Sequence, residues 1–231
     1  EVLYEDNHVI VVNKPQNIPS QADSSEDEDM LSIVKNYIKV KENKPGNVYL
    51  GLVHRLDRPT GGVMVFAKSS KAASRLSEQF KTDEVHKTYY AVVVGTPKEK
   101  TKRLVHYLKK DPRENKVAVV PQFTEGAKYA ELVYEVLESK GGYSLVKVEL
   151  VTGRSHQIRV QMKTIGNPIV GDVKYGGEGM AKGLLNLYAV QLVFEHPTTK
   201  EKMRFIVFPP EKTSKWNLFN IEKYLTIKQV D

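Results

Sequence analysis

The apolar residues of this chain occur mostly in short runs, and this pattern restricts the fold more than any other feature. Each run is bounded by Gly, Pro or charged residues, as is typical of β-strands. Helical periodicity is rare and does not alternate regularly with these runs. The sequence therefore predicts an α+β fold with a mixed, largely antiparallel central sheet and flanking helices. The predicted strands are residues 8–13, 63–67, 89–94, 104–107, 117–120, 128–137, 143–151, 188–194 and 203–208.

Three segments show the spacing of apolar residues that amphipathic helices have, at residues 30–38, 69–80 and 155–165. Acidic residues precede the first segment and favour a helix N-terminus there. Ser69 or Ser70 can cap the second. Gly166 follows the third as a C′ residue. The apolar faces are Met30, Leu31, Val34, Tyr37 and Ile38, then Ala72, Ala73, Leu76 and Phe80, and finally Ile158, Met162 and Ile165.

The 231 residues can form a substantial core, and no linker divides them, so we expect a single domain over residues 1–231. The chain has no cysteine, which excludes disulfides, thiol nucleophiles and cysteine metal sites. This composition suits a reducing cytoplasm, although it is compatible with other compartments. No apolar run is long enough to span a membrane, and the acidic N-terminal residues are unlike a signal peptide.

The formal net charge of the chain is +7. A basic balance favours a polyanionic partner, nucleic acid first, and charge that serves only solubility is an equal alternative. Residues 98–116 are very basic and predict a peripheral excursion. The six histidines lack metal-site spacing, and no phosphate-binding or dinucleotide-binding glycine motif occurs. We therefore expect neither a metal nor a cofactor, and the oligomeric state stays open, with a monomer plausible.

The stretch GLVHRLDRPTGGVMVFAK, residues 51–68, places one acid among basic residues between two apolar segments. Desolvation near a core would push Asp57 toward its neutral form, whereas a nearby guanidinium would keep it ionised. Spacing alone favours a simpler interpretation, in which Asp57 opens a turn through Pro59 and the glycines that follow. The available guanidinium partners are Arg55, Arg58, Arg154 and Arg159.

Two further stretches suit RNA binding. In TGRSHQIRVQMKTIG, the side chains of His156, Arg159 and Lys163 share one predicted helix face, and a basic stripe of this kind suits phosphate. A solvated basic face is the commoner meaning of such a stripe. In HKTYYAVVV, Tyr89 begins a strand beside basic residues, where its ring can stack on a base. A tyrosine in the core is the commoner alternative.

Several stretches together resemble the RluA family of RNA pseudouridine synthases. The family signature H-R-L-D-x-x-T-S-G is similar to HRLDRPTGG at residues 54–62. The resemblance spans nearly the whole chain and implies the pseudouridine synthase fold, a mixed sheet divided by a cleft. The 231 residues contain no counterpart of the small N-terminal S4 RNA-binding domain of many members. The other matches are VVNKP, K-x-Y-x-A-x-V-x-G (Lys87 to Gly95), GRSHQIRV (Gly153 to Val160), GNPIVGDVKYG (Gly166 to Gly176) and FEHP (Phe194 to Pro197).

The resemblance implies roles for individual residues. Asp57 is similar to the catalytic aspartate, Tyr89 to the tyrosine that stacks on uracil and serves as base at C5, and Arg159 to the arginine that pairs with the aspartate. Arg55 is similar to a residue that fills the gap left by a flipped nucleotide. Ile158 is similar to an apolar residue of the base pocket, and its position also suits the core. The other predicted RNA-binding residues are His54, Arg58, Thr60, Lys87, Arg154 and His156.

Four positions depart from the family pattern. Gly61 replaces the serine of T-S-G, and Asn17 stands where glycine usually follows NKP. Asparagine tolerates a positive φ, so we expect the turn at Asn17 to be preserved. Gln161 and Tyr188 occupy places where histidine is common. None of these departures removes the set of Asp57, Tyr89 and Arg159.

The residue types suit the reaction that the resemblance implies. Uridine becomes pseudouridine when N1–C1′ breaks, the base turns and C5 joins C1′, with no redox cofactor and no ATP. The reaction requires a carboxylate at the ribose, a base for the C5 proton and a pocket for a flipped nucleotide. We therefore predict an isomerase that acts on a uridine of rRNA or tRNA. An RNA-binding or folding module is one alternative, and a glycosidase, which would need a second carboxylate, is another.

Overall fold

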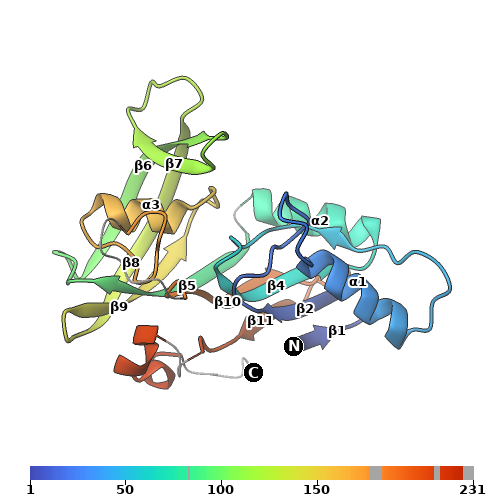
Figure 1. The fold of residues 1–231 in the computed structure, drawn as a ribbon. Coiled ribbons are helices and arrows are strands. Elements are labelled where there is room, and N and C mark those ends of the chain that lie inside the picture. The colour runs from blue at the N-terminus through green and yellow to red at the C-terminus, as the bar shows by residue number, and fades with distance from the viewer. Residues whose placement is uncertain (83, 177–183, 211–213, 226–231) are drawn as a thin grey trace. The chain divides into compact units, whose positions relative to one another are not determined.

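The computed structural model describes residues 1–82, 84–176, 184–210 and 214–225. The chain forms two compact units. Unit 1 comprises Glu1–His86 and Gln191–Val207, and unit 2 comprises Lys87–Val190 and Phe208–Asp231. Strands predominate over helices without regular alternation, which confirms the predicted α+β class (Figure 1). The assignment of residues 1–231 to a single catalytic domain stays a prediction.

Unit 1 contains antiparallel strands that confirm the predictions for residues 8–13 and 63–67. Strand β2 (Val9–Lys14) pairs with β1 (Val2–Glu5) and with β4 (Gly61–Ala67), and the short β3 (Gly51–Leu52) also pairs with β4. Side chains of β2 and β4 are buried along almost their whole length. The register sets Lys14 opposite Gly62. The turn after β2 therefore lies beside the HRLDRPT loop that leads into β4.

Helix α1 begins after the acidic residues that predicted it, and α2 begins at the predicted cap Ser69. The Asp29 side chain accepts a hydrogen bond from the Ser32 backbone at the start of α1 (Met30–Lys41), and Ser69 accepts one from Ala72 at the start of α2 (Ser70–Lys81). Helix α2 packs against β3 and β4 (Figure 1). Its Gln79 side chain exchanges hydrogen bonds of 2.8 and 2.9 Å with the backbone of Glu195. This anchors the end of β10 (Leu187–Glu195), whose Gln191–Glu195 part pairs with β11 (Lys202–Ile206).

Unit 2 is built on an antiparallel sheet whose strand order is β5, β9, β8, β6, β7. The predicted hairpin at Gly141-Gly142 is confirmed, because these glycines join β8 to β9 with φ values of 60° and 79°. A register shift between Val136 and Glu138 interrupts the pairing of β8 with β9. The strand bounds are β5 (His86–Val94), β6 (Thr101–Asp111), β7 (Lys116–Val120), β8 (Lys128–Lys140) and β9 (Tyr143–Leu150).

Residues 98–116, predicted as a peripheral excursion, begin in the sheet of unit 2 and continue into the β6–β7 hairpin at its edge. Most of this segment is strand β6, which lies between β7 and β8 and pairs with both. Leu104 and Leu108 are buried on one face of the strand, while most of the basic side chains are exposed. Cross-strand pairing therefore decides the structure of this segment, and its high charge marks only the solvent-facing positions.

Helix α3 (Gln157–Thr164) packs against β6 and β7 in unit 2 (Figure 1). It begins later than predicted because His156 has a left-handed φ of 53°, which is not helical. The predicted basic stripe is also wrong. His156 and Arg159 are buried, and of the three stripe residues only Lys163 is exposed. The core beneath α3 comprises Leu108, Val117, Ala130, Val160 and Tyr175.

Two short 3₁₀ segments, η1 (Ser214–Leu218) and η2 (Ile221–Lys223), follow in unit 2. They bury Trp216 and Ile221 completely. Among the described residues, we find no helix with the length and apolar character needed to cross a membrane.

Candidate active site

Asp57 lies in the HRLDRPT loop of unit 1, where the structure confirms the turn interpretation. The backbone N–H of Thr60 donates to the Asp57 carbonyl at 2.9 Å. Leu56, the preceding residue, exchanges hydrogen bonds of 3.1 and 2.7 Å with the Ser20 hydroxyl. Leu56 and Ser20 are both buried, while the Asp57 side chain is only half-buried. The fold thus fixes the backbone on both sides of this carboxylate.

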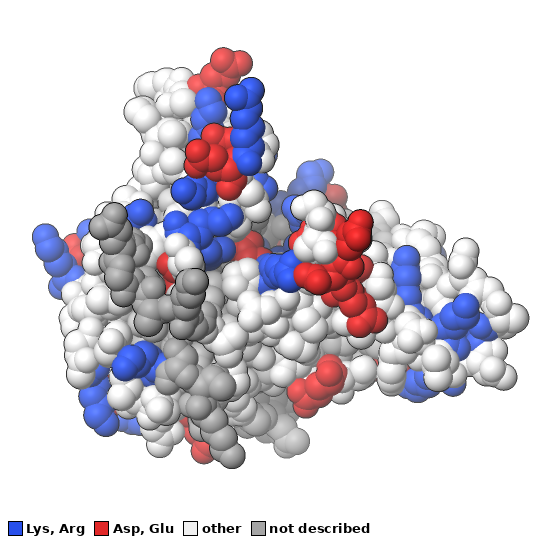
Figure 2. All heavy atoms as spheres, viewed as in Figure 1, with Lys and Arg blue, Asp and Glu red and all other residues white. Residues whose placement is uncertain are grey.

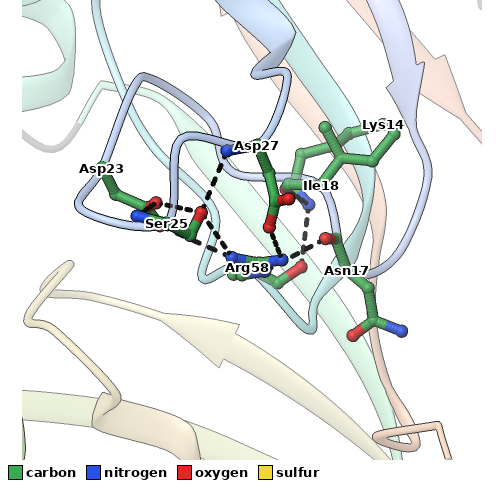
Figure 3. A network of polar contacts seen from close by, with 7 residues as sticks. All are labelled: Lys14, Asn17, Ile18, Asp23, Ser25, Asp27 and Arg58. Atoms are coloured by element: carbon green, nitrogen blue, oxygen red, sulfur yellow. Dashed lines mark hydrogen bonds and ion pairs between the residues drawn. The ribbon is translucent and has the colours of Figure 1, made fainter.

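Lys14 fixes the same loop from beneath. Its side chain is fully buried, and its Nζ donates to the carbonyls of Pro15, Ile18 and Arg58 at 3.0, 2.6 and 3.1 Å. Figure 3 shows the Lys14 side chain between Ile18, in the turn after β2, and Arg58, in the HRLDRPT loop. Burial lowers the pKa of the Lys14 ammonium to about 7, and the nearby Asp57 charge acts in the opposite direction. Lys14 therefore places a titratable cation close to the candidate catalytic acid.

Arg58 is exposed and bound by an acidic loop of its own chain, which we call the acidic loop, residues 21–28. Its Nη1 donates to the Ser25 hydroxyl at 2.9 Å, and its Nη2 makes an ion pair with Asp27 (Figure 3). The Arg58 guanidinium is the main cause of the lowered pKa of Asp27. Arg58 Nε also donates to the carbonyl of Asn17 at 3.2 Å. Asn17 has a φ of 66°, which confirms that this turn is preserved without glycine.

The remaining residues predicted in this loop differ in exposure. The His54 ring stacks on Phe80 of α2 with a centroid distance of 4.5 Å, and its Nε2 accepts from the Val65 backbone at 3.0 Å. These contacts attach the loop to β4 and α2. Thr60 is buried and Arg55 is exposed. Of these three side chains, Arg55 is therefore the most accessible to RNA, and its binding role stays a prediction.

Tyr89 lies in β5 of unit 2, opposite Val148 of β9. The Tyr89 side chain is 9% exposed, so most of it belongs to the interior of the protein. Lys87 lies two residues earlier and therefore on the same face of the strand. It is half-buried, opposite Leu150. The strand thus holds both side chains in fixed positions, as recognition of a planar base would require.

The turn before α3 is organised by a buried glutamine. Gln157 accepts from the Thr152 hydroxyl and the Arg154 backbone at 2.8 and 2.9 Å, and it donates to the Glu131 carbonyl at 3.0 Å. The exposed Arg154 side chain donates through Nε to the Tyr129 carbonyl at 2.8 Å. Ile158 is 4% exposed, which agrees with its alternative interpretation as a core residue.

Arg159 and His156 belong to a buried polar cluster of unit 2. Arg159 makes a two-point ion pair with Asp172, in which Nε and Nη2 donate at 2.8 and 2.7 Å. The His156 Nδ1 lies 2.6 Å from the hydroxyl of Tyr175. Asp172 and Tyr175 were not among the predicted site residues. The predicted pairing of Arg159 with Asp57 stays a prediction.

Gln161, which departs from the family pattern, connects α3 to β6. Its Nε2 lies 2.9 Å from His106 Nδ1 and 3.3 Å from the Leu104 carbonyl. Burial lowers the pKa of His106, so the imidazole is neutral at pH 7 and its Nδ1 can accept this hydrogen bond. The departure at position 161 thus serves the packing of α3.

Charged side chains are mixed on the β6–β7 hairpin, which stands at the top of Figure 2 with blue and red atoms interspersed. Asp111 and Glu114 lie near its tip among basic residues such as Lys110 and Lys116. In the part of the chain that the structure describes, no group of three or more His, Cys, Asp or Glu side chains could hold a metal ion.

Residues 8–164 match the model of the RNA pseudouridylate synthase family. The chain belongs to this family. The matched region includes HRLDRPT, β5 and all of α3, and therefore all three predicted catalytic residues. This confirms the resemblance to the RluA family of pseudouridine synthases.

Three curated pseudouridine synthases are similar in sequence to most of this chain. An uncharacterised RNA pseudouridine synthase of Helicobacter pylori is 33% identical over 90% of the chain and 65% of its own length. The ribosomal large subunit pseudouridine synthase D of Pseudomonas aeruginosa is 33% identical over 89% of the chain and 62% of its length. The synthase C of Yersinia pestis is 34% identical over 98% and 71%. The chain thus spans less than two thirds of the length of the first two relatives.

Two solved structures share the fold. Human RNA Pseudouridylate Synthase Domain Containing 4 is 24% identical, with a TM-score of 0.77 over 91% of this chain and 89% of its own. Human RNA Pseudouridylate Synthase Domain Containing 1 is 24% identical, with a TM-score of 0.70 over 91% and 83%. The predicted pseudouridine synthase fold is therefore confirmed.

Sequence reasoning missed the residues that hold this synthase family's motifs in place. Lys14 and Asp172 lie inside matched motifs, VVNKP and GNPIVGDVKYG, but neither motif indicates what they bind. A lysine directly after the apolar run VIVVN was the available signal, because a charged group beside a buried strand requires partners. Asp172 had no local signal, since it meets Arg159 only in the folded unit.

Proposed function

We propose that this chain isomerises a specific uridine of ribosomal or transfer RNA to pseudouridine. The observation that carries the proposal is the family match over residues 8–164, which includes an aspartate on a turn with a fixed backbone. The relatives named as ribosomal large subunit synthases support rRNA as the substrate class. A basic chain with a net charge of +7 suits a polyanionic partner. RNA as partner and the cytoplasm as compartment belong to the same proposal.

In the proposed reaction, Asp57 acts as a carboxylate on the ribose of a flipped nucleotide while the N1–C1′ bond breaks. The base turns, C5 bonds to C1′, and the proton from C5 leaves to a general base, for which we propose Tyr89. N1 takes up a proton, so the product is an isomer of the substrate. Arg159 supplies positive charge that favours ionised carboxylates in the site. Arg55, Arg58, Lys87 and Arg154 are the proposed contacts of the RNA backbone.

The test measures tritium release from RNA that carries tritium at uridine C5. The wild-type chain should release tritium, and the Asp57→Asn variant should release none above background while it binds RNA within about threefold of wild type. Glu26→Gln, which removes an exposed acid from the acidic loop, is the matched control and should leave the release unchanged. Undiminished release by Asp57→Asn would refute the role of Asp57.

The RNA-binding or folding module makes a different prediction in the same assay. A wild-type chain that binds cellular RNA but converts no uridine, as mapped by pseudouridine sequencing with and without this gene, would support that module. The map also identifies the target uridine if the proposed activity is present.

A further inference from the structure

Asp172 lies at the start of a turn in unit 2 that immobilises its carboxylate. The side chain is fully buried. Its Oδ1 accepts hydrogen bonds from the backbone N–H groups of Lys174 and Tyr175, both at 3.1 Å. The Gly176 N–H closes the turn on the Asp172 carbonyl at 2.6 Å. Two backbone N–H groups therefore hold the carboxylate in addition to Arg159.

Arg159 is held by this carboxylate along one edge of its guanidinium. Nε and Nη2 donate to Oδ2 and Oδ1 of Asp172, and the two side chains are 7% and 0% exposed. A two-point pair of this kind fixes the plane of the guanidinium as well as its position. The third nitrogen, Nη1, is not part of this pair. Because the guanidinium is planar, fixing Nε and Nη2 also fixes the position of Nη1.

Tyr175 holds the face of the same guanidinium. The Arg159 Cζ lies 5.0 Å from the Tyr175 ring centroid, which is within the range of a cation–π contact. The Tyr175 hydroxyl accepts from the Val117 N–H at 2.9 Å and lies 2.6 Å from His156 Nδ1. Tyr175 is thereby anchored to β7 and to the residue before α3.

We propose that Asp172 is the positioning residue of Arg159 and sets the plane and the direction of its guanidinium in the active site. This proposal rests on the proposed function, because it assigns to Arg159 an action during the isomerisation. Asp172 itself does not touch the reacting atoms. Buried ion pairs are often replaceable without loss of stability, so a fixed two-point pair is better explained by the orientation it imposes.

The first experiment compares Asp172→Asn with wild type in the tritium-release assay. The amide keeps the size of the side chain, but its NH₂ group is a donor and cannot accept a hydrogen bond from the guanidinium. We therefore expect kcat to fall about ten- to a hundredfold, while KM for RNA changes less than about threefold. Asp172→Glu keeps the charge with a longer side chain and should lie between the two. Glu149→Gln removes an exposed acid that pairs with Lys147 in the same unit and should leave both constants unchanged.

Two results separate positioning from a merely structural role. In an Arg159→Ala background, Asp172→Asn should lower kcat no further, and an additive loss would overturn the proposal. Guanidinium ion should restore activity to Arg159→Ala, at least fivefold, only when Asp172 is present. Equal restoration in the Arg159→Ala, Asp172→Asn double variant would also overturn the proposal.

A measurement without activity keeps the proposal separate from the proposed function. In protein labelled with ¹⁵N-arginine, rotation about the Arg159 Cζ–Nε bond should be hindered in wild type and at least tenfold faster in Asp172→Asn. Equal rotation rates would overturn the positioning role, even in an active enzyme. A wild-type chain that forms no pseudouridine, yet shows this difference, would overturn the proposed function and leave the orientation of Arg159 by Asp172 established.

Discussion

Arg58 and Arg159 both form ion pairs with aspartates, but they do so in opposite environments. Arg58 and its partner Asp27 are 41% and 54% exposed, and both belong to loops of unit 1. Arg159 and Asp172 are 7% and 0% exposed, and they join a helix to a turn of unit 2. The partner of Arg58 sits on an acidic surface loop, whereas the partner of Arg159 is itself held by two backbone N–H groups.

The environment of an arginine, more than the presence of an ion pair, decides what its guanidinium can do. An exposed pair contributes little to stability and opens readily, so Arg58 can exchange Asp27 for a phosphate. A buried two-point pair cannot open without leaving a charge uncompensated. We therefore infer that Arg58 suits adaptable contacts with RNA, while Arg159 suits a fixed direction at the reacting nucleotide.

We expect the largest loss of stability when the buried ion pair between Arg159 and Asp172 is broken. Asp172→Ala leaves the Arg159 guanidinium buried without its acid, so the free energy of unfolding should fall by about 3–5 kcal/mol. Arg58→Ala, the matched change at the exposed pair, should lower it by less than about 1 kcal/mol. Urea unfolding monitored by fluorescence measures both values. Similar losses of unfolding free energy in Asp172→Ala and Arg58→Ala would show that burial does not make the Arg159–Asp172 pair more important for stability than the exposed pair of Arg58.

Much of the fold could be predicted because its signals are local. The caps Asp29 and Ser69 fix where α1 and α2 begin, and the glycines at 141–142 fix the β8–β9 hairpin. The turn at Asp57 also follows from neighbouring residues. In each case the residues that decide the structure lie within a few positions of one another, so the sequence pattern is sufficient.

The interior polar contacts could not be predicted because they depend on tertiary structure. The periodicity around Arg159 suggested a solvated basic face, but Asp172, 13 residues later, makes that face a buried one. His156 has a left-handed backbone instead of continuing the helix. Lys14 meets the carbonyl of Arg58 across 44 residues of sequence. Only the folded units show which charges are buried and what they bind.

The side chain of Arg58 is exposed, but its carbonyl accepts a hydrogen bond from the buried Lys14. The pKa of Lys14 is about 7 in the folded protein, below that of an unfolded lysine. Between these two values the unfolded state binds more protons, so stability should rise with pH, by at most about 1.4 kcal/mol per pH unit, from about pH 7 to about pH 9. Urea unfolding over this range measures the slope.

Lys14→Met is the control for this pH dependence. It removes the titrating group, so its free energy of unfolding should show a flatter pH profile than wild type above about pH 7. Below about pH 7, lysine is protonated in both states, and the two profiles should run parallel. Parallel profiles over the whole range would show that Lys14 does not titrate near neutral pH.

We expect a smaller change, in RNA affinity, when the exposed ion pair of Arg58 is removed. Besides Asp27, the Asp23 carboxylate lies 3.9 Å from Arg58 Nη1. In the Asp23→Asn, Asp27→Asn double variant Arg58 loses both acidic partners, so RNA should bind about two- to fivefold more tightly than to wild type. The free energy of unfolding should change little, because both ion pairs are exposed to solvent. Fluorescence anisotropy with labelled RNA at constant salt measures the affinity.

The control for this variant removes the same charge from the same loop without removing an acid that pairs with Arg58. Glu26 and Glu28 are exposed acids of the acidic loop, and the Glu26→Gln, Glu28→Gln double variant reports the general effect of lower negative charge. Affinity should rise more in the aspartate variant than in the glutamate variant, and Arg58→Ala should abolish the difference. Equal RNA affinities of the two double variants would contradict this prediction. The acidic loop would then repel RNA only through its total charge, and releasing Arg58 from its ion pairs would add no contact with RNA.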